Sequence, residues 1–132
     1  MTISSVNNEK VKYWASLKLK KNRDKDKCFL VEGNHLIKEA KEKGLVISTI
    51  SISDNNADFL VTKEIMKKIS DQKSISDNAA IVRYIPEQEI KGNVLILDDI
   101  QDPGNLGTLI RSSIAFGFSN IIMSEGSVDL YN

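Results

Sequence analysis

The sequence predicts an α/β protein built from two parts, and three observations lead to this prediction. Over the first 85 residues or so, short apolar runs typical of buried strands alternate with amphipathic stretches typical of helices. Residues 86–93, a polar segment with one proline and one glycine, then predict an interdomain linker. After this linker the order strand, helix, strand occurs once more, so the second part is expected to be a single βαβ unit.

The elements of the first part follow from capping residues and apolar periodicity. Ser5 or Asn7 is expected to cap a first helix with Trp14 in its apolar stripe, and residues 22–27 are expected to form a charged loop. A strand is predicted at 28–32 and is broken by Gly33. The next helix is expected to be capped by Asn34, to face inward with Leu36, Ile37 and Ala40, and to end at Gly44. Strands at 46–52 and 59–61, a helix capped by Thr62 that runs through Ile69, and a strand at 79–85 follow.

The second part begins with the continuously apolar run 94–97, which is typical of a parallel strand buried on both faces. The helix that follows carries one apolar side and is expected to end at Gly117; this side consists of Leu106, Leu109, Ile110 and Ile114. A strand is predicted at 120–123. One βαβ unit cannot cover its own sheet faces.

Composition favours an ordinary soluble protein. The chain has 132 residues, of which 41% are hydrophobic and 27% charged, and no apolar stretch approaches the roughly 18 residues of a membrane span. A polar N-terminus predicts no secretory signal, and we expect a cytoplasmic protein without a membrane partner. Cys28 alone can form neither an internal disulfide nor a multi-cysteine zinc site, so no metal is expected, and this thiol is expected to be buried. His35, the single histidine, is expected to be structural or to face a bound partner rather than to be catalytic.

The net charge of zero hides an asymmetry. Residues 1–27, which we call the basic arm, hold eight basic and three acidic side chains, whereas the remainder of the chain is acidic. Such an arm suits a phosphate-rich partner, although a solvated helix face with a lysine-rich loop would give the same pattern. The cations of this arm that could contact such a partner are Lys10, Lys12, Lys18, Lys20, Lys21, Arg23 and Lys25.

The loop and helix start at residues 98–111 are the most specialised stretch of the chain. Pro103 fixes φ and Gly104 permits a positive φ, so a sharp turn is expected at the end of the preceding strand. Asn105 could cap the helix or offer its amide to a ligand. Gly107 and Arg111 are spaced i, i+4 on one helical face, which leaves room for a ligand beside the guanidinium. A plain strand–helix connection with a surface arginine is the alternative, and neither nucleotide-binding glycine fingerprint is complete.

The segment from Asp98 to Gly117 resembles the first motif of the SpoU/TrmH RNA ribose 2′-O-methyltransferases of the SPOUT superfamily, with its Asn-x-Gly-x-x-x-Arg core at Asn105, Gly107 and Arg111. Residues 8–19 and 29–40 resemble the substrate-binding domain of that family, an α/β fold similar to certain ribosomal proteins that bind RNA kinks. The resemblance implies an RNA substrate-binding domain at 1–88. It implies an incomplete start of a knotted, Rossmann-like SPOUT catalytic domain at 89–132.

By this resemblance S-adenosylmethionine is the methyl donor and a ribose 2′-hydroxyl of rRNA or tRNA the acceptor. Arg111 and Asn105 are implied as catalytic residues, with Gly104 and Gly107 in the active-site loop. Because a guanidinium holds its proton far above neutral pH, anchoring a phosphate and stabilising charge on the ribose oxygen is the safer role for Arg111, and its part in proton transfer stays open.

The second and third motifs of the family are not in the sequence, so the cofactor-binding residues are expected beyond residue 132 and this chain alone is expected not to methylate RNA. The family usually dimerises through the catalytic domain, and a homodimer is expected when that domain is complete. A non-catalytic RNA-binding module is the alternative function.

Overall fold

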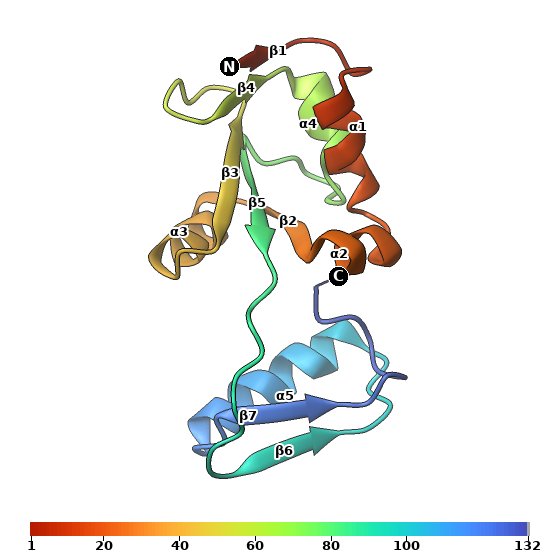
Figure 1. Ribbon diagram of the computed structural model, residues 1–132, viewed down its shortest axis with the longest axis vertical. Helices are drawn as coiled ribbons and strands as arrows, with labels where there is room; N and C mark the ends of the chain where they lie inside the picture. The colour runs from red at the N-terminus through yellow and green to blue at the C-terminus, as the bar shows by residue number, and fades with distance from the viewer. Residues whose placement is uncertain (132) are drawn as a thin grey trace. The chain divides into compact units, whose positions relative to one another are not determined.

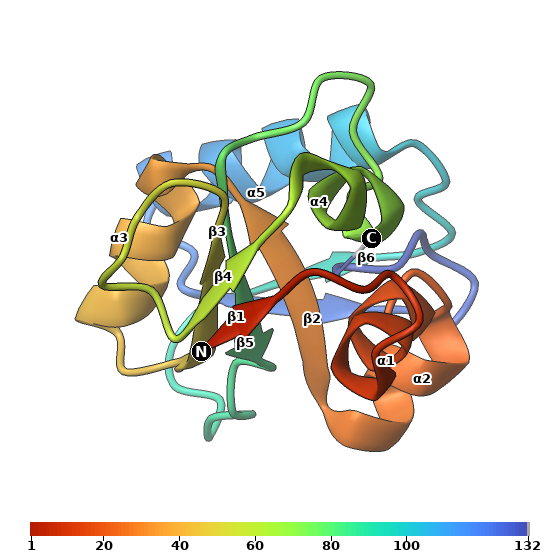
Figure 2. The same ribbon diagram turned by 90° about the horizontal axis from the view of Figure 1, so that it is seen from above.

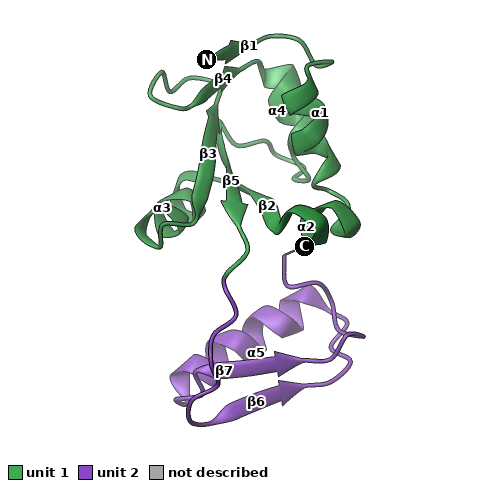
Figure 3. Cartoon of the chain, in the orientation of Figure 1, with its two compact units in different colours: residues 1–85 green, residues 86–132 purple. Residues whose placement is uncertain are grey.

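The computed structural model describes residues 1–131, and the chain divides into two compact units, residues 1–85 and 86–132 (Figure 3). The first unit contains β1 (Thr2–Ile3), α1 (Glu9–Ser16), α2 (Lys20–Asp26), β2 (Cys28–Glu32), α3 (Asn34–Glu42), β3 (Val46–Ser51), β4 (Phe59–Val61), α4 (Lys63–Ile69) and β5 (Asn78–Arg83). The second contains β6 (Val94–Leu97), α5 (Pro103–Ala115) and β7 (Asn120–Met123) (Figure 1). The predicted α/β class is confirmed.

The first unit is built on a mixed five-stranded sheet in the order β1-β4-β3-β5-β2. β3 pairs parallel with β4 and antiparallel with β5, and β5 pairs antiparallel with β2. β1, a two-residue strand that the sequence did not predict, pairs parallel with β4 at the edge. β4, β3 and β5 are therefore each hydrogen-bonded on both sides, and β1 and β2 are the edge strands.

Helices cover both faces of this sheet, and the alternation of side chains along β5 serves both layers (Figure 2). Ala79 and Ile81 pack into the larger cluster under α1 and α4, whereas Ala80 and Val82 pack with Ile37 and Ala40 of α3. These four side chains of β5 are all buried. The unit is thus a three-layer α/β/α domain with its own core.

Most predicted elements of this unit are confirmed, with three corrections at the helices. α1 is capped by Asn8, whose side chain accepts from the backbone N–H of Lys10, and not by Ser5 or Asn7. α3 begins one residue earlier than expected, because Gly33 with φ +92° is its N-cap, and Leu36 on that helix is exposed rather than inward-facing. Trp14 and Cys28 are buried as predicted.

The third correction concerns residues 22–27, which lie largely in α2 rather than in a charged loop. This seven-residue helix has no apolar stripe, and the residue that it buries is Arg23. The guanidinium of Arg23 donates to the carbonyl oxygens of Leu17 and Lys18, at 2.9 and 2.8 Å. An arginine that satisfies the carbonyls at the end of α1 therefore takes the place of an apolar anchor.

In the second unit, β6 and β7 pair parallel with α5 as the crossover between them. Leu97, Leu106 and Ser113 are buried. The prediction that β6 is buried on both faces is wrong for the described residues, because Ile96 and its register partner Ile122 are 69% and 42% exposed. Ile114 of α5 is also exposed, so the apolar side predicted for this helix does not reach its last turn. Over residues 1–131, no helix has the length and apolar character needed to cross a membrane.

Candidate functional site

The connection from β6 to α5 turns at Asp99, not at Gly104. Asp99 has φ +53°, a left-handed conformation that few non-glycine residues adopt. Gly104 lies inside the first turn of α5 and has no positive φ. The predicted role of Gly104 in making the turn is therefore wrong.

Gly104 is needed for a different reason, which is the cap of α5. The Asp102 side chain accepts from the backbone N–H of Asn105 at 2.7 Å, and Pro103 occupies the first turn. A Cβ on Gly104 would lie 2.9 Å from Asp102 Oδ2, so the capping carboxylate would have to shift. The capping role that the sequence offered to Asn105 belongs to Asp102.

Hydrogen bonds tie this loop to the segment that follows β7. The hydroxyl of Ser124 accepts from the N–H of Asp99 at 2.8 Å, and the hydroxyl of Ser127 accepts from the N–H of Ile100 at 3.1 Å. Gln101 Nε2 donates to both Asp99 Oδ1 and the carbonyl oxygen of Gly126. The two loops at the carboxyl ends of these parallel strands therefore hold each other in place, and sequence patterns gave no sign of this role for Ser124 and Gln101.

Arg111 lies on a face of α5 that also holds two glycines. Gly104, Gly107 and Arg111 are spaced i, i+3, i+7, which places them on one helical face. A Cβ on Gly107 would meet no atom within 4 Å. Arg111 is exposed and forms no hydrogen bond or ion pair with any residue that the structure describes. The expected arrangement of Gly107 beside Arg111 is therefore present, with the exposed Thr108 hydroxyl donating to the carbonyl oxygen of Gly104 on the same side of the helix.

Asn105 does not share this face. Six residues separate it from Arg111, which at 100° per residue puts the two side chains about 120° apart around the helix. The Asn105 side chain is exposed at the start of α5. The two side chains thus project from different sides of α5 and do not converge on one point.

The lysines of the basic arm differ in whether they have a partner within the chain. Lys12 pairs with Glu9 at 2.7 Å, and Lys20 pairs with Asp24 at 2.6 Å. The hydrogen bond from Lys20, together with one from Tyr84, lowers the pKa of Asp24. Lys18 donates to the carbonyl oxygen of Ser70 at 2.8 Å.

The remaining cations of the arm divide into free and engaged groups. Lys21 and Lys25 are exposed on α2 and have no partner among residues 1–131. Lys10 lies over the ring of Phe59, with Nζ 5.2 Å from the centroid. Arg23 is 5% exposed, so the prediction of a solvent-facing cation at this position is wrong.

Other titratable side chains do not gather into a site. Among the described residues, no three or more His, Cys, Asp or Glu side chains lie together as metal ligands would. His35 is exposed on α3, with Nε2 3.2 Å from Glu39. Burial and the contact with Cys28 raise the pKa of Tyr13, whose hydroxyl lies 3.2 Å from the thiol.

Comparison with family models assigns each unit separately. Residues 8–80, more than half of the chain, match the MRM3-like substrate binding domain. Residues 92–132 match the SpoU rRNA Methylase family.

Relatives and solved structures agree with these matches. The 23S rRNA (guanosine(2553)-2′-O)-methyltransferase RlmP of Bacillus subtilis is 32% identical over 98% of this chain and 57% of its own length. The mitochondrial rRNA methyltransferase 3 of Homo sapiens is 28% identical over 83% of this chain and 31% of its own. The chain thus spans little more than half the length of the bacterial relative.

The fold is shared with two methyltransferase crystal structures. One, of an RNA 2′-O ribose methyltransferase, has a TM-score of 0.74 at 27% identity and covers 99% of this chain and 58% of the other. The other, of an rRNA methyltransferase from Sinorhizobium meliloti, has a TM-score of 0.81 at 24% identity over 99% and 57%. With a substrate-binding domain, a methylase segment and this fold, the chain belongs to the SpoU/TrmH family of RNA methyltransferases and spans the N-terminal half of the family fold.

Proposed function

We propose that this chain is part of an S-adenosylmethionine-dependent rRNA methyltransferase that acts on a ribose 2′-hydroxyl in the cytoplasm. Residues 1–88 would bind the RNA and residues 89–132 would begin the catalytic domain. Two features support the proposal. The relatives are rRNA 2′-O-methyltransferases, and the chain retains the exposed Arg111 beside Gly107, where a Cβ would meet no atom within 4 Å.

The exposed guanidinium carries the proposal. Arg111 keeps its proton at neutral pH, so it donates hydrogen bonds and does not accept them. It would hold an RNA phosphate through two parallel N–H donors and stabilise the negative charge that develops on the ribose oxygen. Gly104 and Gly107 would let the RNA backbone approach α5, and Asn105 would orient the substrate from the side of the helix start.

S-adenosylmethionine would supply the electrophilic methyl group. The polar groups of the loops after β6 and β7 largely bind each other, through Ser124, Ser127 and Gln101. These loops therefore do not offer a set of free donors and acceptors for the cofactor within residues 1–131, and we expect the cofactor to be bound by other residues. We accordingly propose that the 132-residue chain by itself transfers no methyl group.

A chimera tests the role of Arg111. This chain would replace the matching N-terminal portion of the Bacillus subtilis relative, and methyl transfer to 23S rRNA would be measured with labelled cofactor. We expect Arg111→Ala to lower kcat by roughly 100-fold or more, as loss of one charge-stabilising donor does. Ser112→Ala, an exposed neighbour on the same helix, is the matched control and should keep full activity. An Arg111→Ala chimera with unchanged turnover would remove the catalytic assignment.

The RNA contact is proposed for the lysines of the basic arm, without Arg23. Charge reversal of the two free cations, Lys21→Glu with Lys25→Glu, should weaken RNA binding and reduce the slope of log affinity against log salt by about 2. Lys63→Glu on α4 is the control outside the arm. A salt slope that does not change would exclude the arm as a phosphate contact.

A non-catalytic RNA-binding module is the second candidate, because the larger unit has its own core and matches a substrate-binding domain. Calorimetric titration with S-adenosylmethionine separates the two. Stoichiometric binding to the 132-residue chain would contradict our reading that its loops are committed to each other. Binding by the chimera alone would favour the enzyme.

We further propose that the complete catalytic domain forms a homodimer. The exposed apolar side chains of the second unit, which include Ile96, Ile122 and Phe116, would favour burial of this surface. Light scattering of the chimera would detect the dimer.

A further inference from the structure

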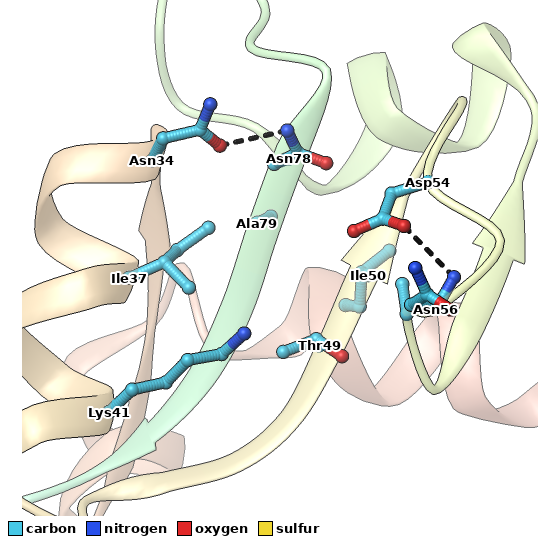
Figure 4. A pocket seen from close by; sticks show the side chains of 10 residues that line it. Asn34, Ile37, Lys41, Thr49, Ile50, Asp54, Asn56, Asn78 and Ala79 are labelled. Atoms are coloured by element: carbon cyan, nitrogen blue, oxygen red, sulfur yellow. Dashed lines mark hydrogen bonds between the residues drawn. The ribbon is translucent and has the colours of Figure 1, made fainter.

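The first unit contains a hollow that none of the functions above uses. It lies between one face of α3, strands β3 and β5, and the loop 53–58, and Figure 4 shows the side chains around it. The cavity volume is about 120 Å³. The lining residues are Asn34, Ile37, Lys41, Thr49, Ile50, Asp54, Asn56, Ala57, Asn78 and Ala79.

The lining combines apolar walls with a polar rim. Ile37 and Ala57 contribute apolar side chains, and Ile50 and Ala79 line the hollow from the strands while their side chains pack into the larger cluster on the other side of the sheet. Asn34, Lys41 and Asp54 are exposed at the rim, so donors and an acceptor stand around an apolar space. A flat aromatic heterocycle has matching chemistry, because its faces are apolar and its edge carries both donors and acceptors.

A buried hydroxyl holds the rim in place. Ser51 is 1% exposed, and it donates to Asn78 Oδ1 at 2.6 Å while accepting from the N–H of Asp54 at 2.9 Å. Asn78 Nδ2 then donates to Asn34 Oδ1 at 2.8 Å, as Figure 4 shows. This chain of bonds fixes the orientation of two amides before any ligand arrives.

Two donors remain without a partner at the rim. The oxygen of the Asn34 amide is occupied by Asn78, which leaves its NH₂ group free among the described residues. Lys41 extends along the hollow and makes no ion pair with residues 1–131, although its charge contributes to lowering the pKa of Asp58. The carboxylate of Asp54 accepts from the N–H of Asn56 at 2.9 Å and keeps further acceptor capacity.

The size of the hollow limits what it can hold. Sites for drug-sized ligands and cofactors usually enclose about 300–1,000 Å³. This cavity is well below that range, so it suits a single ring rather than an entire nucleoside cofactor. A base inside a duplex cannot enter it, because its edge is paired and its faces are stacked.

We propose that this hollow receives one unpaired nucleobase of the RNA substrate, with Asn34, Lys41 and Asp54 contacting its edge. The inference rests on the proposed function, since it assumes that RNA is the substrate. It adds a recognition point on the α3 side of the sheet, whereas the larger core cluster packs under α1 on the other side. The basic arm would hold phosphates of either single or double strands, and the hollow would respond only to an unpaired base.

Binding of RNA to the 132-residue chain tests this difference. Fluorescence anisotropy would compare a short single-stranded RNA of mixed sequence with the blunt duplex of the same sequence. Ala57→Leu fills the hollow, and Lys41→Ala removes a rim donor without adding bulk. We expect each variant to weaken single-strand binding roughly fivefold and to leave duplex binding unchanged. Lys38→Ala, on the same helix but outside the hollow, is the matched control.

Amide NMR spectra of the same chain locate the contact. Addition of single-stranded RNA should shift resonances of Asn34, Lys41 and the 54–57 loop in the parent chain and not in Ala57→Leu, whose other resonances confirm that it folds. If single-stranded RNA bound both variants as tightly as it binds the parent chain, the inference about the hollow would be overturned, and the proposed RNA binding by residues 1–88 would remain supported. A chain that binds neither RNA would overturn the inference together with the proposed role of residues 1–88, and the chimera assay of Arg111 would still test catalysis separately.

Discussion

The two units of the chain differ in how completely they bury their own apolar side chains. In the first, β5 is buried on both faces and apolar clusters pack against each side of the sheet. In the second, β6 and β7 present Ile96 and Ile122 to solvent, and Ile114 of α5 and its C-cap residue Phe116 are also exposed. The first unit has an apolar core on each face of its sheet. The second unit holds the loop between β6 and α5 on elements that leave large apolar side chains exposed. The difference shows that the order of secondary structure alone does not say whether a segment has a complete core.

Native-state hydrogen exchange on the 132-residue chain should show the largest effect of this difference. We expect amides in β5 to exchange on the order of a thousandfold more slowly than those in β7, because an isolated two-stranded sheet is marginally stable. Equal protection in both strands would show that the second unit is as cooperative as the first.

Core substitutions should separate the units next. Ile65 is fully buried, so Ile65→Ala should lower the free energy of unfolding of the first unit by about 2–5 kcal/mol. Ile122→Ala should change the same transition by less than about 0.5 kcal/mol. Fluorescence of Trp14, the single tryptophan and a member of the larger cluster, reports this transition during urea unfolding. A shift of the Trp14 midpoint in Ile122→Ala would mean that the units unfold as one.

The helix caps offer a matched pair of smaller effects. Thr62 caps α4 by accepting from the N–H of Ile65, and Asp102 caps α5 in the same way. Thr62→Ala and Asp102→Ala should each cost about 1 kcal/mol locally, measured by exchange of the first-turn amides. Of the two, only Asp102→Ala should also lower methyl transfer by the chimera, and Asp102→Asn should restore both helix protection and activity. Full activity in Asp102→Ala would show that the loop does not depend on its cap.

The smallest effect is the acid sensitivity of the first unit. Backbone and side-chain hydrogen bonds from Thr49 lower the pKa of Asp58 below its ordinary value near 4. The folded state thus has the lower pKa, so the contribution is complete above the unfolded-state pKa and is lost as the pH falls through the folded-state value. Urea midpoints between about pH 6 and pH 3 should therefore fall less steeply in Asp58→Asn than in the parent chain. Parallel pH profiles would contradict this.

Much of the fold could be predicted from the sequence because apolar periodicity and capping residues act locally. The strands at 28–32 and 94–97 and the Thr62-capped helix are present with bounds at or close to the predicted ones. α2 could not be predicted, because its anchor is not an apolar side chain but a buried arginine that donates to the carbonyls at the end of α1. The exposure of Ile96 has the opposite cause: the sequence of the strand predicts burial, and no described residue provides it.

The candidate site was predictable in its motif and not in its geometry. The spacing of Gly107 and Arg111 correctly placed them on one face of α5. Because glycine adopts a positive φ most easily, the sequence pointed to Gly104. The positive φ lies instead at Asp99, where hydrogen bonds to the hydroxyls of Ser124 and Ser127, more than twenty residues away, hold the backbone of Asp99 and Ile100. The hollow beside α3 left no local pattern, since its lining comes from four separate segments.

The bond between Asp99 and Ser124 has a consequence for how this sequence can vary. The Ser124 hydroxyl accepts from the N–H of a residue whose backbone is already unfavourable, so neither position is free to change without regard to the other. Serine or threonine at position 124 preserves the hydrogen-bond acceptor. Alanine at 124 should be tolerated best together with glycine at 99, because glycine adopts a positive φ with a smaller conformational free-energy penalty. Positions 99 and 124 should therefore covary in libraries selected for activity. A library that randomises only 98–111 would leave out the residues after β7 that hold the loop.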